Sequence, residues 1–162
     1  MLVIARVRPS VRALTEDDTH VTPGPPRGLR VVHASRSPAA KFARVDFPFP
    51  HALGPEASQE DVFDVARGPI EAALDTGSAA VVFAYGQTGS GKTYTMLGGG
   101  TFRTRGLMQR ALGLVFARAE GATRAGGCAP SVHLSMAEVL GEGVFDVLGH
   151  LPPGSAAVAA SG

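Results

Sequence analysis

Apolar residues recur at helical spacing in the stretch that follows Ser58. The positions on this apolar face are Val62, Phe63, Ala66, Ile70, Ala73 and Leu74. Such spacing predicts an amphipathic helix with one buried face. Ser58 and Asp61 have the arrangement of a capping box, so the helix should begin there. Gly68-Pro69 lies within the pattern, and we expect it to kink the helix or divide it in two, because proline cannot donate the helical hydrogen bond.

Other apolar runs have the length and residue types of strands. Val3 to Val7 is β-branched and apolar, and Val132 to Val139 alternates between apolar and polar or small residues. Two short alternating runs, Leu29 to Val32 and Phe42 to Phe47, suit edge strands or hairpins. Ala79 to Tyr85 is apolar throughout, which favours a buried strand.

A glycine-rich segment follows this last run directly. It reads Gly86-Gln87-Thr88-Gly89-Ser90-Gly91-Lys92-Thr93 and matches the phosphate-binding pattern GxxxxGK[ST] at every fixed position. Its glycines let backbone amides wrap around a phosphate, and the helix-forming stretch from Thr93 to Leu97 adds the positive end of a helix dipole. An ordinary glycine-rich turn before a lysine is the alternative, but the strand-like run before the segment and the helix after it favour a phosphate site.

Two side chains of this segment give the predicted site its ligand chemistry. Lys92 can reach the β- and γ-phosphate oxygens of a nucleotide as a point charge. The Thr93 hydroxyl can complete the coordination shell of a Mg²⁺ ion held between those phosphates. The segment therefore predicts a site for a nucleoside triphosphate with Mg²⁺.

The residues on both sides of the loop resemble the signature of the kinesin motor domain. Residues 83 to 96 read FAYGQTGSGKTYTM and match that signature almost letter for letter, beyond the positions that all phosphate-loop proteins share. The resemblance implies an α/β fold of the P-loop NTPase class, with a mixed β-sheet flanked by helices. It also implies ATP and Mg²⁺ as ligands, and an ATPase that moves along microtubules in the complete protein. Gly106 to Phe116 is similar to a further helical piece of the family.

A second motif, Arg6-Val7-Arg8-Pro9, resembles the RxRP sequence near the N-terminus of kinesins. The resemblance places Arg6, Arg8 and Pro9 on the adenine ring of ATP, with Tyr94 on the other side of the ring. Guanidinium planes and proline rings both stack on aromatic bases, so the assignment is physically reasonable. On the residues alone, a strand end that carries solvated arginines is the alternative.

The chain resembles only the first part of a motor domain. Residues 1–150 correspond to the N-terminal half of that domain, and residues 151–162 form a low-complexity tail that we expect to be disordered. No segment resembles the family's switch I or switch II, so we identify no catalytic residue and expect this chain alone not to hydrolyse ATP. Asp146 to Gly149 fits a DxxG sensor pattern, but its register matches a structural segment of the family. A nucleotide-binding or regulatory module without hydrolysis or motility is therefore the alternative function.

The missing half also has a consequence for folding. Buried parallel strands need partners on both sides, and in the family some of those partners lie in the C-terminal half. We therefore expect the isolated chain to be marginally stable or prone to aggregation.

Composition and charge narrow the class of protein further. The chain has 162 residues, of which 44% are hydrophobic and 18% charged, as in a single globular domain. Its net charge of +1 argues against nucleic acid or a membrane as partner. Cys128 is the only cysteine, which excludes a disulfide framework and fits a reducing compartment. We expect a cytoplasmic protein of the microtubule cytoskeleton, with tubulin as its partner.

Overall fold

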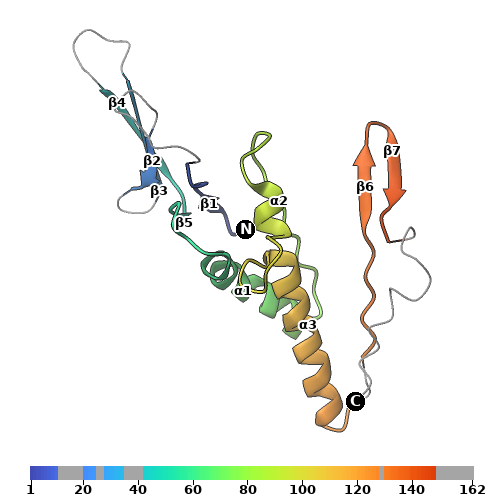
Figure 1. The fold of residues 1–162 in the computed structure, drawn as a ribbon. Coiled ribbons are helices and arrows are strands. Elements are labelled where there is room, and N and C mark those ends of the chain that lie inside the picture. Colours follow the sequence, from blue (N-terminus) through green and yellow to red (C-terminus); the bar gives the residue numbers. More distant parts are fainter. Residues whose placement is uncertain (11–19, 25–27, 35–41, 128–129, 149–162) are drawn as a thin grey trace. The chain divides into compact units, whose positions relative to one another are not determined.

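The computed structural model describes residues 1–10, 20–24, 28–34, 42–127 and 130–148. The chain divides into two compact units, residues 1–117 and residues 118–162. Figure 1 shows the order of the elements along the chain. The predicted tail at 151–162 and the loop between β3 and β4 lie outside the described residues.

A short parallel pair of strands begins the first unit. β1 (Ile4–Arg6) pairs with β5 (His51–Leu53), and the Val7 amide donates to the Leu53 carbonyl at 2.9 Å. This pair confirms the strand predicted at residues 3–7. β5 was not predicted, because three residues between Pro50 and Gly54 are too few to show a periodic pattern.

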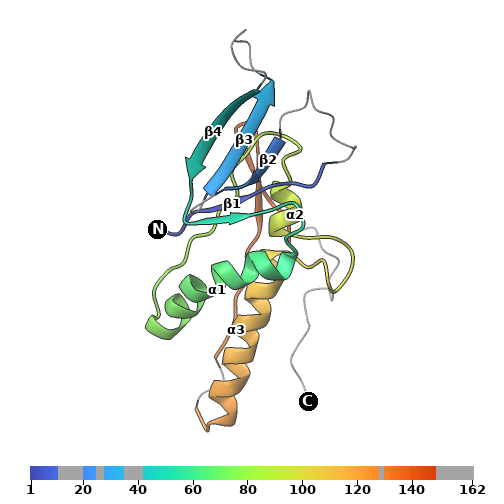
Figure 2. The ribbon, with the colours of Figure 1, turned by 90° about the vertical axis from the view of Figure 1, so that its left-hand side faces the viewer.

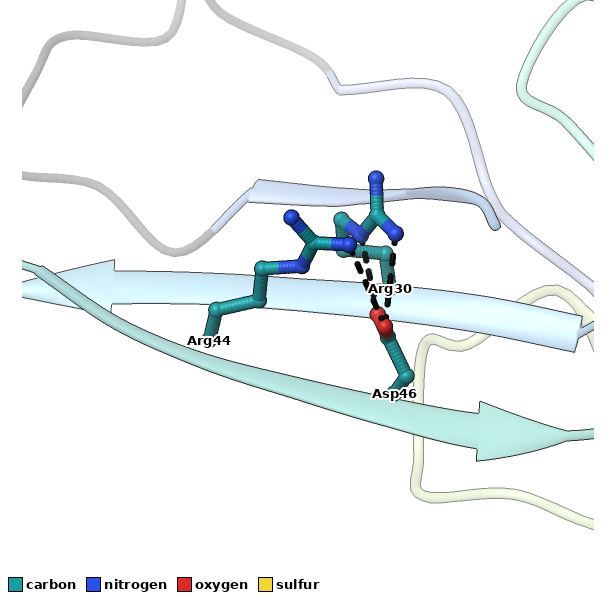
Figure 3. A network of polar contacts seen from close by, with 3 residues as sticks. All are labelled: Arg30, Arg44 and Asp46. Atoms are coloured by element: carbon teal, nitrogen blue, oxygen red, sulfur yellow. Dashed lines mark hydrogen bonds and ion pairs between the residues drawn. The ribbon is translucent and has the colours of Figure 1, made fainter. Parts of the chain in front are cut away.

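Between these two strands the chain forms an antiparallel sheet. It consists of β2 (His20–Pro23), β3 (Gly28–Ala34) and β4 (Phe42–Pro48) in that order, which confirms the hairpin predicted from the two alternating runs. Asp46 faces Arg30 across the β3–β4 ladder and accepts from Arg30 Nε at 2.9 Å and from Arg44 Nη2 at 3.3 Å (Figure 3). Because the Asp46 carboxylate is exposed, these ion pairs contribute less than about 1 kcal/mol each and chiefly fix the register.

The predicted amphipathic helix is α1 (Gln59–Thr76), and it begins with the expected capping box. The Ser58 hydroxyl accepts from the Asp61 amide at 3.1 Å, and Asp61 Oδ2 accepts from the Ser58 amide at 2.7 Å. We expected a kink or a division at Gly68-Pro69. The helix runs on through Pro69, so it is not divided there. Gly68 has no Cβ to clash with the proline ring, and the buried face on both sides of Pro69 offsets the lost hydrogen bond.

The core of the first unit lies between α1 and α3 (Leu107–Arg124). Its buried members are Val62, Phe63, Ala66, Ile70 and Leu107. The two helices meet near the start of α3 and then diverge (Figure 2), and Leu107, the first residue of α3, is its buried member of the core. Leu74 was predicted to be buried but is 37% exposed, whereas Ala73 beside it is buried at 9%.

The apolar run before the glycine-rich loop does not form the predicted strand. Residues 79–85 have no strand partner among the described residues, and Val81, Phe83 and Tyr85 are 85%, 78% and 96% exposed. The expectation of a buried strand was therefore wrong for this chain. A strand needs a neighbouring strand to accept and donate its backbone hydrogen bonds, whatever its apolar content. The predicted helix after the loop is present as α2 (Lys92–Met96).

The second unit contains the end of α3 and a β-hairpin. The hairpin pairs β6 (Ala137–Leu140) with β7 (Gly143–Asp146), and Val147 N donates to Met136 O at 2.9 Å. The strand predicted at residues 132–139 therefore forms only in its last part, since residues 131–136 have no partner strand in the described ranges. Asp146 Oδ1 accepts from the Leu148 amide at 3.0 Å, which is a local turn contact. No helix in the described ranges is both long and apolar enough to cross a membrane.

The capping box gives a direct test of what starts α1. Ser58→Ala should lower the free energy of unfolding by about 1 kcal/mol, because the Asp61 amide loses its acceptor at the first turn. Urea unfolding followed by circular dichroism measures this loss. Ser78→Ala is the matched control, since Ser78 follows the other end of the helix and bonds an exposed Thr76 hydroxyl. Equal losses for both variants would contradict the assigned role of Ser58.

The same contact predicts a pH dependence. The hydrogen bonds from the Ser58 hydroxyl and amide hold the pKa of the Asp61 carboxyl below its usual value. A carboxyl whose pKa is lower in the folded state stabilises that state above its unfolded pKa, about pH 4, and loses this contribution as the pH falls through the folded pKa. The stability difference between the unmodified chain and Ser58→Ala should therefore shrink at acidic pH, and a constant difference would contradict the linkage.

Candidate nucleotide-binding site

The glycine-rich loop has the backbone that its sequence requires. Gly89 and Gly91 have φ values of 78° and 99°, in the left-handed region that glycine adopts without strain. Gly86 has a φ of 157°, which residues with a side chain rarely adopt, and a Cβ there would lie 2.5 Å from Ser90 Oγ. The Ser90 amide donates to Gln87 O at 3.1 Å and closes the turn.

This turn leaves several amides free to bind a ligand. In the part of the chain that the structure describes, the amides of Gly89, Gly91, Lys92 and Thr93 donate to no protein acceptor. Backbone amides at such a turn bind an anion, since each N–H otherwise lacks a partner. Because α2 has only five residues, its dipole adds little, and the amides and Lys92 carry the attraction.

Lys92 and Thr93 lie where the loop enters α2. Lys92 Nζ donates to Gly86 O at 2.9 Å and to Gln87 O at 3.0 Å. An ammonium group has three hydrogens, so one remains for a phosphate oxygen while the other two hold the side chain against the loop. The Thr93 side chain is exposed, and its hydroxyl can serve as a single protein ligand to a Mg²⁺ ion that takes its other ligands from phosphates and water. The residues of the loop therefore fit a polyphosphate with Mg²⁺.

The arginine-proline segment lies against the same loop. Arg8 Nη1 donates to the Gly89 carbonyl, and both Arg8 and Pro9 are exposed. The Arg6 guanidinium lies over the Tyr94 ring, with its central carbon 5.6 Å from the ring centroid. The structure thus brings Arg8 against the phosphate-binding loop and places Arg6 directly over the ring of Tyr94, while Pro9 is exposed beside Arg8.

Arg6 is held by protein groups on several sides. Its Nη1 donates to Gln59 Oε1 at 2.8 Å and to Thr95 Oγ1 at 3.0 Å, and its Nη2 donates to Ala57 O at 3.2 Å. Burial lowers the pKa of the Arg6 guanidinium, and the nearby Tyr94 opposes that shift. The guanidinium remains a cation at neutral pH, because arginine is not deprotonated in proteins.

Gln59 is a residue that the sequence analysis did not single out. It is 3% exposed, and among the described residues it is the only polar or charged residue that is buried. Its Nε2 donates to the Tyr94 carbonyl at 2.5 Å, while its Oε1 accepts from Arg6. The signal that could have revealed it is its spacing, because position 59 falls on the same helical face as the buried Val62, Phe63 and Ala66.

Comparison with known protein families gives one match over most of the chain. A family model described as the kinesin motor domain matches residues 6–159. Among curated relatives, kinesin-like protein KIN-14M of Arabidopsis thaliana is 35% identical over 147 residues, which cover 90% of this chain and 20% of the relative. Kinesin-like protein KIN-5A of Oryza sativa subsp. japonica is 40% identical over 103 residues, covering 64% of this chain and 10% of the relative. The chain thus spans a fifth or less of the length of these two relatives.

Solved structures are similar in fold. The structure titled "Structure of a fast kinesin: Implications for ATPase mechanism and interactions with microtubules" has a TM-score of 0.67 and 28% identity, and the match covers 91% of this chain and 40% of that one. The motor domain of the Kar3-like kinesin from Ashbya gossypii has a TM-score of 0.65 at 24% identity, over 90% of this chain and 45% of that one, which is similarity of fold alone. These similarities confirm the predicted α/β fold of the P-loop NTPase class.

Proposed function

The chain belongs to the kinesin motor domain family, and from this premise we propose that its glycine-rich loop binds Mg-ATP. Members of this family bind nucleotide at such a loop. The observation that carries the proposal is the turn itself, in which unpaired amides, the Lys92 ammonium and the Thr93 hydroxyl lie within one short segment. A polyphosphate is the ligand that uses all three kinds of group at once.

In this proposal each group of the loop binds a different part of Mg-ATP. Amides of the turn hold the β-phosphate, Lys92 reaches the β- and γ-phosphate oxygens, and Thr93 holds Mg²⁺ through its hydroxyl. When bound, ATP supplies the phosphoryl group whose transfer releases energy. Arg8, Pro9 and Tyr94 form the surface for adenine, and Arg6 supports that surface through its contact with the Tyr94 ring. The contact of Arg8 with Gly89 supports the placement of these residues beside the phosphates.

For the whole protein we propose ATP hydrolysis coupled to movement along microtubules, and hence a place in the microtubule cytoskeleton of the cytoplasm. The family match supports this, as does the similarity to a kinesin structure whose title names an ATPase mechanism and microtubules. The measurement is the rate of ATP hydrolysis by the complete protein with and without microtubules, which should rise when microtubules are added. Nucleotide binding without any such rise would favour a regulatory nucleotide-binding module instead.

Thr93 gives the test of the metal in this proposal. Thr93→Val keeps the shape of the side chain and removes the hydroxyl, so the chain should lose most of the affinity that Mg²⁺ adds, on the order of tenfold. Titration calorimetry with ATP, in the presence of either Mg²⁺ or a chelator, measures this difference. Thr88→Val is the matched control, because Thr88 is an exposed threonine of the same loop outside α2. If Thr93→Val keeps the Mg²⁺ dependence of the unmodified chain, Thr93 does not hold the metal.

A further inference from the structure

The site contains a residue to which no role in nucleotide binding has been given above. Gln59 lies at the first turn of α1, and its carboxamide contacts two other segments of the chain. We propose that Gln59 is a positioning residue, which sets Arg6 and Tyr94 in place for the base of the nucleotide. This inference rests on the proposed binding of Mg-ATP.

Both ends of the Gln59 carboxamide form hydrogen bonds. Oε1 accepts from Arg6 Nη1 at 2.8 Å, and Nε2 donates to the Tyr94 carbonyl at 2.5 Å. A buried amide of this kind has a fixed orientation, because a rotation would place a donor against a donor and an acceptor against an acceptor. Gln59 therefore ties β1 to α2 through the start of α1.

The Arg6 guanidinium is held by protein acceptors and by the Tyr94 ring. Its Nη1 donates to Gln59 and Thr95, and its Nη2 donates to the Ala57 carbonyl, so these nitrogens are directed at protein acceptors. What Arg6 presents to Tyr94 is the guanidinium group over the ring, 5.6 Å from the centroid. Arg6 thus affects the binding of the base by holding the Tyr94 ring. Gln59 affects it by holding both Arg6 and Tyr94.

Tyr94 keeps an accessible surface. Its side chain is 45% exposed, although its carbonyl is held by Gln59 and its ring lies beside Arg6. An aromatic ring that is fixed on one side and open on another can stack on a base without losing further side-chain freedom. The Gln59 network therefore fixes the contact with the base and leaves the contact with the phosphates to the loop.

The test compares a ligand that has a base with one that does not. Gln59→Met removes both hydrogen bonds at nearly constant size, and it should weaken binding of Mg-ATP about tenfold while changing binding of Mg-tripolyphosphate by less than about twofold. Gln59→Glu keeps the acceptor for Arg6 and loses the donor to the Tyr94 carbonyl. Its affinity for Mg-ATP should therefore fall between those of the unmodified chain and Gln59→Met. Titration calorimetry on the full chain measures the affinity of the unmodified protein and of each variant for both ligands. Gln109→Met is the matched control, because Gln109 accepts from the Gly106 amide at the start of α3 and should leave both affinities unchanged.

The affinities for the two ligands distinguish a positioning role of Gln59 from a general role in the fold. A loss for Mg-ATP alone supports the positioning role. Equal losses for Mg-ATP and Mg-tripolyphosphate, or no loss in either Gln59 variant, would overturn it, since Gln59 would then serve the fold in general or not serve the site. Lys92→Ala separates this failure from failure of the proposed function, because it should weaken both ligands whatever Gln59 does.

Discussion

Replacement of Lys92 by alanine should weaken the binding of Mg-ATP about a hundredfold, which corresponds to roughly 2.7 kcal/mol. The ammonium group is held against the loop by Gly86 O and Gln87 O at 2.9 and 3.0 Å, so it is in place before the ligand arrives. Its removal deletes a charged hydrogen-bond donor to the phosphate oxygens and a positive charge beside a multiply charged anion. Titration calorimetry, or competition with a fluorescent ATP analogue, measures the loss.

The control for this variant must separate binding from folding. Lys41 is the only other lysine of the chain and lies outside the described residues, and Lys41→Ala changes the net charge by the same amount. Lys92 is not part of the hydrophobic core, so neither variant should alter the urea midpoint by much. Unchanged affinity in Lys92→Ala, with the fold intact, would show that the phosphate site is wrongly assigned.

The second large effect is on stability. Phe63→Ala should lower the free energy of unfolding by about 3–5 kcal/mol, because it removes the largest buried side chain of α1 from a core of few members. Phe63 is 5% exposed and lies among Val62, Ala66, Ile70 and Leu107. Since domains of this size are stable by about 5–15 kcal/mol, the loss should leave a large unfolded fraction.

Circular dichroism during urea unfolding tests this expectation. Phe116→Ala is the matched control, since Phe116 is a phenylalanine of α3 that is 49% exposed and should cost much less. Similar losses for the two variants would mean that the interface of α1 and α3 is not the core that holds the unit together. A saturating concentration of Mg-ATP should raise the midpoint of the unmodified chain, because a ligand that binds only the folded state stabilises it.

The exposed apolar run before the loop bears on how the chain behaves in solution. Val81, Phe83 and Tyr85 expose most of their surface, and the run has the composition of a buried strand. Unpaired segments of this type associate with other strands. The expectation that the isolated chain is marginally stable or aggregates therefore stays a prediction. Residues 79–85 are the segment at which we expect aggregation to begin.

Local rules in the sequence determined much of this protein. The capping box fixed the start of α1, the spacing of Val62 to Ala73 fixed its buried face, and the glycine pattern fixed the turn at residues 86–91. These features depend on residues within a few positions of one another, so each can be read from a short stretch of sequence.

The tertiary structure decided the features that depend on distant partners. It left residues 79–85 without a neighbouring strand among the described residues, let α1 continue through Pro69, and left Leu74 37% exposed. It also joined Gln59 to Arg6 and Tyr94, which lie 53 and 35 positions away along the chain. A sequence pattern indicates which structure a segment is suited to form. Whether its backbone hydrogen bonds are made and its apolar side chains are buried depends on the groups that pack against it in the folded chain.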